Sequence, residues 1–108
     1  MSKVYITQER QFDFSSAEEY GDLVFLSVDD MWNGRNSPHN AKLIEHLYDQ
    51  LKDFNSDKDF IILSGSDMVI AAVFMLLGRL QVRRVSILRW SNRDRIYELA
   101  EIRLGSVL

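Results

Sequence analysis

The chain has 108 residues, of which 46% are hydrophobic and 27% are charged, with five glycines, one proline and no cysteine. This length predicts a single α/β-sized domain over residues 1–108, and the abundance of apolar residues excludes a disordered chain. The absence of cysteine excludes disulfides and thiolate metal sites, which suits a reducing cytoplasm, and the formal net charge is only −3.

The charge is divided unevenly along the chain. Residues 1–67 carry 13 acidic and 6 basic side chains, a balance of −7, whereas residues 68–108 carry 3 acidic and 7 basic side chains, a balance of +4. All basic residues of the second part are arginines, which form bidentate contacts with carboxylates and phosphates. We therefore predict an interaction surface made of Arg83, Arg84, Arg89, Arg93 and Arg95. The alternative is that these arginines pair with the acidic part of the same molecule or with a second copy.

The first third of the chain predicts short elements. In order, these are an edge strand at Lys3–Thr7, a loop at Gln8–Phe14 pinned by Phe12 and Phe14, a helical turn at Ser15–Tyr20, and a strand at Asp22–Val28. The Asp22–Val28 run is almost continuously apolar, which is typical of a strand that is covered on both faces. A loop at Asp29–Ser37 follows.

The middle of the chain predicts one amphipathic helix. Ser37 is a suitable N-cap and Pro38 suits the first helical position, so we expect a helix over Pro38–Phe54. Four apolar residues recur at helical spacing and are expected to face a sheet: Ile44, Leu47, Tyr48 and Leu51.

The last part of the chain predicts a buried strand at Asp59–Ser64 and then a helix at Met68–Leu77. Ser66 or Asp67 would cap this helix, and Gly78 would stop it. A strand at Val82–Trp90, a turn at Ser91–Asp94 and an antiparallel edge strand at Arg95–Glu98 follow. The sequence leaves open whether residues 99–108 form a strand, a helix or a disordered tail.

This order of elements predicts a parallel sheet with right-handed crossovers. We expect a small Rossmann-like or flavodoxin-like three-layer domain with four to five strands and an antiparallel edge hairpin. Because the Met68–Leu77 helix is apolar on every side, a short chain has few elements with which to cover it. A homo-oligomer is therefore expected.

A ligand site is predicted at the carboxyl ends of the parallel strands, where open α/β sheets bind their ligands. The candidate ligand-binding residues are Trp32, Ser64, Gly65, Ser66, Asp67, Trp90 and Asn92. The turn at residues 64–67 precedes a helix N-terminus, which favours an anion such as a nucleotide phosphate, and the indole rings could stack on a base. The alternative is an ordinary tight turn with an N-cap, because the Walker lysine and the G-x-G-x-x-G spacing are both missing.

Metal binding and catalysis find little support in the sequence. Asp29 and Asp30 are the best metal candidates, but adjacent carboxylates in a loop are typical of a solvated turn. His39 and His46 lie about two helical turns apart, which is too far for one zinc ion. No G-x-S-x-G nucleophile elbow is present. We expect no metal, no cofactor and no catalytic residue.

Membrane insertion and export are not expected either. The first residues lack the apolar run of a signal peptide, and the apolar stretch Met68–Leu77 is half the length that spans a bilayer. We therefore expect a cytoplasmic protein. The net negative charge argues against nucleic acid as a partner.

Three segments resemble small proteins encoded by tailed bacteriophages. They are YGDLVFL at Tyr20–Leu26, DFIILSGS at Asp59–Ser66, and VSILRW at Val85–Trp90 followed by Arg95, Ile96 and Tyr97. The resemblance covers residues 3–98 and implies a phage origin, an accessory role in the host cytoplasm and no catalytic residue. The leading hypothesis is thus a non-enzymatic module that binds itself or a host protein. The alternative is a binder of a nucleotide or other anion.

Overall fold

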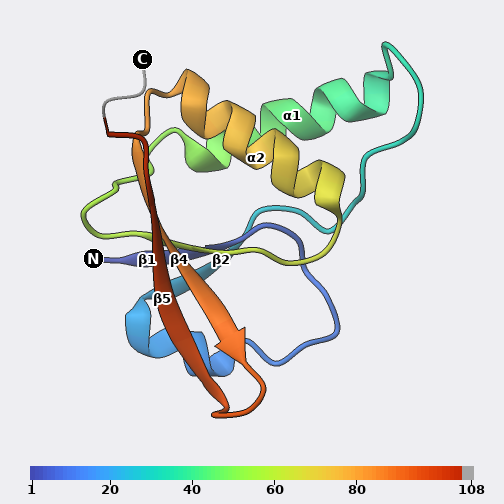
Figure 1. Ribbon diagram of the computed structural model, residues 1–108. Helices are drawn as coiled ribbons and strands as arrows, with labels where there is room; N and C mark the ends of the chain where they lie inside the picture. The colour runs from blue at the N-terminus through green and yellow to red at the C-terminus, as the bar shows by residue number, and fades with distance from the viewer. Residues whose placement is uncertain (106–108) are drawn as a thin grey trace.

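A five-stranded sheet forms the centre of the computed structural model, which describes residues 1–105 (Figure 1). The strands are β1 (Lys3–Ile6), β2 (Asp22–Phe25), β3 (Phe60–Ile62), β4 (Arg84–Ser91) and β5 (Ile96–Arg103). Their spatial order is β2-β1-β3-β4-β5; the first four are parallel, and β5 pairs antiparallel with β4. The expected mostly parallel sheet with an antiparallel edge hairpin is confirmed.

Helical elements cover both faces of this sheet. Helices α1 (Pro38–Leu51) and α2 (Asp67–Arg79) lie on one face, and the 3₁₀ helix η1 (Ser15–Tyr20) lies on the other (Figure 1). The chain passes from β1 through η1 to β2 in one direction, and α1 then carries it back across the sheet to β3. The direction of winding therefore reverses between β1 and β3.

Serine caps begin both long helices. The Ser37 hydroxyl accepts a hydrogen bond from the Asn40 amide at 3.2 Å, and Ser66 accepts one from the Met68 amide at 3.2 Å. Such caps satisfy amides that have no partner inside the helix. Ser37 is the cap that the sequence predicted, and Ser66 rather than Asp67 caps α2.

The two N-terminal strands exchange the positions predicted for them. The expectation that Lys3–Thr7 forms an edge strand is wrong, because β1 lies between β2 and β3. Strand β2 is the edge instead, and it ends at Phe25, leaving Val28 70% exposed. An apolar run and a short alternating run carry no information about spatial order, which is set here by the reversal after β2.

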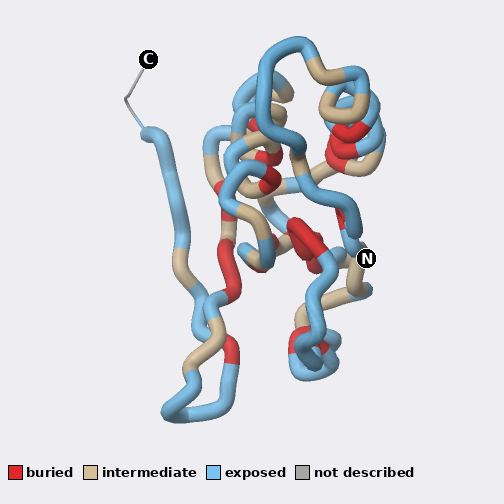
Figure 2. Tube along the Cα trace, turned by 90° about the vertical axis from the view of Figure 1, so that its right-hand side faces the viewer, coloured by how far each residue is buried: buried red, intermediate tan, exposed pale blue. Residues whose placement is uncertain are grey.

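Two apolar clusters fill the spaces on either side of the sheet. Along β1, Tyr5 points toward the helices, whereas Val4 and Ile6 point toward η1, as the alternation of strand side chains requires. The cluster under the helices includes Leu47 and Val73. In Figure 2 the buried segments lie in the middle of the molecule, and exposed segments surround them.

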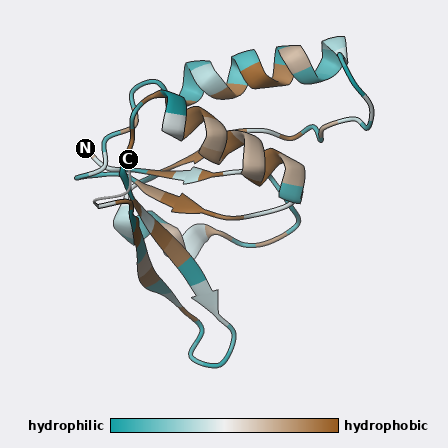
Figure 3. Ribbon diagram, turned by 45° about the horizontal axis from the view of Figure 1, so that its top comes forward, coloured by the Kyte–Doolittle hydropathy of each residue, from teal (hydrophilic) through white to brown (hydrophobic). Residues whose placement is uncertain are grey.

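Helix α2 is largely covered by its own chain. Val69, Val73 and Leu77 are buried, while Met68 and Met75 remain 57% and 78% exposed. Figure 3 shows apolar residues along the length of α2, in contrast to the alternating colours of α1. The uncovered apolar surface of this helix is therefore confined to a few side chains.

Strand β5 is longer than the sequence predicted, and it includes part of the segment 99–108 whose structure the sequence left open. It extends over eight residues to Arg103, so the segment after Leu99 continues as strand, while residues 106–108 lie outside the described part of the chain. The β4–β5 hairpin projects from the sheet, and much of β5 is exposed (Figure 2).

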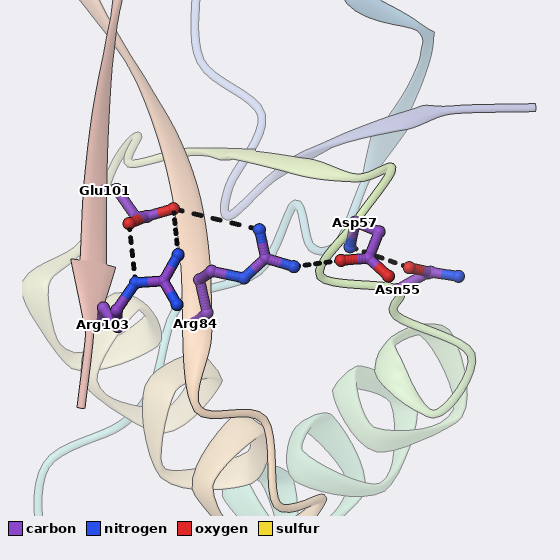
Figure 4. Close-up of polar contacts among 5 residues, drawn as sticks. All are labelled: Asn55, Asp57, Arg84, Glu101 and Arg103. Carbon is purple, nitrogen blue, oxygen red and sulfur yellow. Dashed lines mark hydrogen bonds and ion pairs between the residues drawn. The ribbon is translucent and has the colours of Figure 1, made fainter. Parts of the chain in front are cut away.

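Several arginines of the basic segment contact carboxylates of the same molecule. Figure 4 shows Arg84 between Asp57 and Glu101, with its Nη1 atom 3.9 Å from the Glu101 carboxylate. Arg103 Nε lies 3.1 Å from the same carboxylate. Asp57 belongs to the acidic part of the chain, so the alternative of pairing within one molecule applies to Arg84.

Candidate functional site

The carboxyl ends of β1 and β3 meet where the winding reverses, and the side chain of Gln8 fills the space between them. Gln8 is 1% exposed. Its Oε1 atom accepts a hydrogen bond from the Ser66 amide at 2.7 Å, and its Nε2 atom donates to the Asp29 carbonyl at 3.0 Å. One side chain thus joins the start of α2 to the loop that follows β2.

Thr7 closes the same crevice from the neighbouring position. Its hydroxyl donates to the Ser64 carbonyl at 2.6 Å and accepts from the Ser64 amide at 2.8 Å. Gly65 has φ +82°, and a Cβ atom there would lie 2.7 Å from the Cβ of Gln8. We call this packed junction of Thr7, Gln8, Ser64, Gly65 and Ser66 the closed crevice.

A carboxylate of the protein itself lies at the N-terminus of α2. The Ser66 hydroxyl, helped by the Met31 amide, holds the pKa of the exposed Asp30 carboxyl below its ordinary value. Asp67 adds a second acid in the first turn of the helix. Helix N-termini favour negative charge, and here the chain supplies that charge.

An open pocket of about 500 Å³ lies one strand further along the sheet, beside the second half of β4. Its lining residues are Phe12, Phe14, Ile62, Leu63, Ser64, Ile87, Leu88, Arg89, Trp90, Asn92 and Tyr97. We call this pocket the aromatic notch.

Ring contacts build the walls of the aromatic notch. The Trp90 ring lies 5.0 Å from that of Tyr97 and 5.8 Å from that of Phe12, and Phe12 lies 5.0 Å from Phe14. Aromatic pairs at these separations contribute beyond the area that they bury. The loop that carries Phe12 and Phe14 is thereby held against the β4–β5 hairpin.

Few polar groups reach the aromatic notch. Trp90 Nε1 donates to Asn92 Oδ1 at 3.0 Å. Arg89 is the charged residue of the lining; its side chain is exposed and makes no hydrogen bond or ion pair within residues 1–105. The Tyr97 hydroxyl is buried without a hydrogen-bond partner in that range, and burial, with a smaller effect of the Asp13 carboxylate, raises its pKa.

The structure brings some of the predicted ligand residues together and separates the others. Ser64, Trp90 and Asn92 line the aromatic notch, whereas Gly65, Ser66 and Asp67 form the start of α2. Trp32 is 62% exposed and stacks on His39 at 4.1 Å, near the start of α1. Of the predicted arginine surface, Arg89 alone lines the notch, and Arg93 lies 3.4 Å from its neighbour Asp94.

Sequence reasoning missed the rings that complete this pocket. Phe12 and Phe14 were interpreted as anchors of a loop, and Tyr97 as part of an edge strand. A signal was present in the sequence, because two phenylalanines in a predicted loop need an apolar surface against which to pack. Across the described residues, no group of three or more potential ligands among His, Cys, Asp and Glu could hold a metal ion, and no helix is long and apolar enough to cross a membrane.

The fold and the notch together define a small α/β protein with an aromatic surface pocket. The chain belongs to the Phage Pam3 gp32-like protein family, whose model matches residues 2–104. The predicted resemblance to small phage proteins is thus confirmed, and this family indicates a phage accessory protein. No curated protein and no solved structure matches the sequence.

Proposed function

We propose that this phage protein acts without catalysis, as a protein-interaction module that assembles with a second copy through β5. The observation that carries the proposal is the open edge of β5, where Ile96, Leu99 and Ile102 are 53%, 62% and 47% exposed. Natural edge strands are usually short or protected by proline, lysine or a bulge. Strand β5 has eight residues and contains neither proline nor lysine.

The backbone of β5 supports pairing with another strand. The Leu104 amide donates to the Arg83 carbonyl at 2.9 Å, and this pair continues the β4–β5 register. Since hydrogen-bonded and non-bonded pairs alternate in an antiparallel ladder, the backbone groups of Tyr97, Leu99 and Glu101 face away from β4. These groups are available to a second strand.

The exposed side chains of β5 complement a second copy of the same strand. If two copies pair antiparallel about Leu99, the two Leu99 residues face each other, and each Ile96 faces Ile102 of the other copy. Cross-strand apolar pairs of this kind stabilise a sheet. The resulting arrangement is a closed two-fold dimer.

Sedimentation analysis of charge variants tests this assembly. We expect a dimer for the natural chain and a monomer for Leu99→Lys, which places two like charges opposite each other at the centre of the pair. Met75→Lys is the matched control, because Met75 is 78% exposed on α2 and should leave the dimer intact. A natural chain that is monomeric at every concentration contradicts the proposal. Dissociation by Met75→Lys alone would assign the interface to α2.

We also propose that the protein works in the host cytoplasm, on itself or on a host protein. A phage accessory role and the absence of a membrane-spanning helix within residues 1–105 support this location. Fractionation of infected cells tests it, since recovery in the membrane or periplasmic fraction would contradict it.

We further propose a doubly wound, flavodoxin-like assignment for the sheet. The order β2-β1-β3-β4 and the placement of η1 opposite α1 and α2 support it, since that fold reverses its winding at the same point. An experimental structure with a different strand order would contradict it.

Binding of a nucleotide is the second candidate function. It is supported by the meeting of Ser64, Trp90 and Asn92 in one pocket beside Arg89, an arrangement that offers a stacking ring near a cation. A thermal-shift panel of nucleoside monophosphates and triphosphates tests it, because a ligand stabilises the folded state in proportion to ln(1 + [L]/Kd). No shift at millimolar concentrations of any nucleotide would remove this candidate.

A further inference from the structure

The aromatic notch exists because β4 is longer than β3. The pairing of the two strands ends at Ile61 opposite Ile87, whereas β4 continues to Ser91. Beyond Ile87, β4 is therefore paired on its β5 side and unpaired on its β3 side. The notch occupies the place that a longer β3 would have filled.

This gap leaves backbone hydrogen-bonding groups without partners. Trp90 pairs with Tyr97 in the register of β4 and β5, at a position where the alternation of the ladder directs the Trp90 amide and carbonyl away from β5. Outside the strand ladders, no hydrogen bond within residues 1–105 involves either group, and the ladder between β3 and β4 ends at Ile87. A donor and an acceptor of the main chain thus face the notch side by side.

The walls of the notch indicate what could use these groups. The lining is mostly apolar and aromatic, and Arg89 is its charged residue. A large apolar side chain matches the walls, a carboxylate matches Arg89, and an extended main chain matches Trp90. An extended peptide provides all three at once.

We propose that the aromatic notch binds an extended segment of a partner protein by strand addition to β4. The segment exchanges main-chain hydrogen bonds with Trp90, inserts an aromatic or large aliphatic side chain between Phe12 and Tyr97, and directs an acidic residue to Arg89. This mode of recognition takes its affinity from the main chain and its specificity from side-chain pockets. The inference deepens the proposed interaction module and rests on it, but it uses the side of β4 opposite to β5.

A nucleotide fits the same place less well. Its base could stack on Trp90, but it would leave the main-chain groups of Trp90 unpaired, and Arg89 would be the one cation of the lining for its phosphates. The peptide satisfies more of the groups that the fold presents there.

Two synthetic pentapeptides test the proposal. The first is acetyl-Val-Glu-Phe-Glu-Val-amide, in which each glutamate lies next to the phenylalanine and on the opposite face, as Arg89 lies next to Trp90 along β4. The second is the same peptide with N-methyl groups on both glutamates, which removes main-chain donors but keeps the side chains. In a Trp32→Phe background, the fluorescence reports on Trp90 alone. We expect the first peptide to change this emission saturably and to slow hydrogen exchange of the Trp90 amide at least tenfold. The methylated peptide should bind at least tenfold more weakly, because strand addition depends on main-chain hydrogen bonds.

Matched variants separate the notch from other surfaces. Arg89→Glu should weaken binding of the first peptide about tenfold, since a hydrogen-bonded charge contact is lost and a like charge replaces it. Arg93→Glu is the control and should bind normally, because Arg93 lies on the hairpin turn outside the lining. Phe12→Ala should also weaken binding and keeps the test informative if another variant fails to fold.

Each outcome decides between the two proposals. Equal binding of the methylated peptide, an unchanged Trp90 amide, or a response of Trp90 to AMP or UMP but not to the peptide overturns the strand-addition proposal. Peptide binding that persists in the monomeric Leu99→Lys variant supports the notch independently of self-assembly. Loss of the dimer in that variant without peptide binding by any form leaves the β5 interface standing and removes the notch.

Discussion

The closed crevice and the aromatic notch lie at the carboxyl ends of neighbouring strand pairs, yet one is sealed and the other is open. Between β1 and β3, Gln8 takes up the amide of Ser66 and the carbonyl of Asp29. Between β3 and β4, no side chain takes the corresponding role for the main chain of Trp90 within the described residues. The reversal of winding marks where a ligand could bind, and the polar side chains that follow each strand decide whether the place is left free.

This difference also shows what stabilises each end of the sheet. The closed crevice depends on hydrogen bonds made by the buried side chains of Thr7 and Gln8, whose loss is costly because the remaining partner stays unsatisfied. The aromatic notch depends on ring contacts that are partly exposed, which are cheaper to lose. Substitutions in the closed crevice should therefore lower the free energy of unfolding more than substitutions in the aromatic notch.

The largest effect is expected for Gly65→Ala. Its φ of +82° is unfavourable for alanine, and the new methyl group would displace Gln8 from its hydrogen bonds. Urea denaturation should show a loss of about 4 kcal/mol in the free energy of unfolding. Gly34→Ala is the control: Gly34 has φ +107°, but a Cβ atom there would have no neighbour within 4 Å, so only strain of about 1–2 kcal/mol is expected. Equal losses for the two variants would show that the crevice has room.

Gln8→Leu should be the next most severe change. It preserves much of the apolar volume but leaves the Ser66 amide and the Asp29 carbonyl without partners, so a loss of about 3 kcal/mol is expected. Gln11→Leu, an exposed position on the following loop, should change stability by less than about 0.5 kcal/mol. If Gln8→Leu is as stable as the natural chain, the crevice is not sealed by these bonds.

Phe12→Ala tests the open side and should cost about 1–2 kcal/mol, less than a fully buried phenylalanine, because its ring is 45% exposed. In the Trp32→Phe background, the emission of Trp90 should also shift to the red as its ring contact with Phe12 is lost. Tyr48→Ala is matched in exposure, at 39%, and lies on α1 outside the notch lining, so it should leave that emission unchanged. A larger loss for Phe12→Ala than for Gln8→Leu would reverse the comparison.

The sequence predicted the element types and their order well, because caps and apolar runs are local signals. Ser37 and Ser66 begin the helices as expected, and the apolar run at residues 60–62 lies in a buried strand. Spatial order was less accessible: β1 proved central, and the expected inward positions Ile44 and Tyr48 are 40% and 39% exposed. Only the packed structure determines which side of helix α1 faces the sheet.

The candidate site was predicted in part for the same reason. Ser64, Trp90 and Asn92 lie near the carboxyl ends of strands that are neighbours in the sheet, and they line one pocket, as the rule of carboxyl ends leads one to expect. The rule could not show that Gln8 would fill the adjacent crevice, because that depends on a hydrogen bond between Gln8 and Ser66, which are 58 residues apart in the sequence. Nor could it show that β4 extends beyond the end of β3, since the ends of a strand are set by its pairing partners rather than by its own residues.

The smallest effect is expected for Tyr97→Phe, which removes a buried hydroxyl that has no partner within residues 1–105. Below pH 9 the free energy of unfolding should stay equal or rise by up to about 1 kcal/mol, because an unsatisfied polar group no longer has to be buried.

Burial and the Asp13 carboxylate raise the pKa of Tyr97 in the folded state, so the fold favours the neutral phenol. That contribution is fully present below the ordinary tyrosine pKa of 10.0 and is lost as the pH rises through the higher folded value. Urea denaturation from pH 8 to 11 should therefore show a smaller alkaline loss for Tyr97→Phe than for the natural chain, with Tyr5, whose pKa is also raised by burial, accounting for much of the remainder. An identical alkaline loss in both chains would show that the Tyr97 hydroxyl reaches water, and the notch would then be wetter than its aromatic lining indicates.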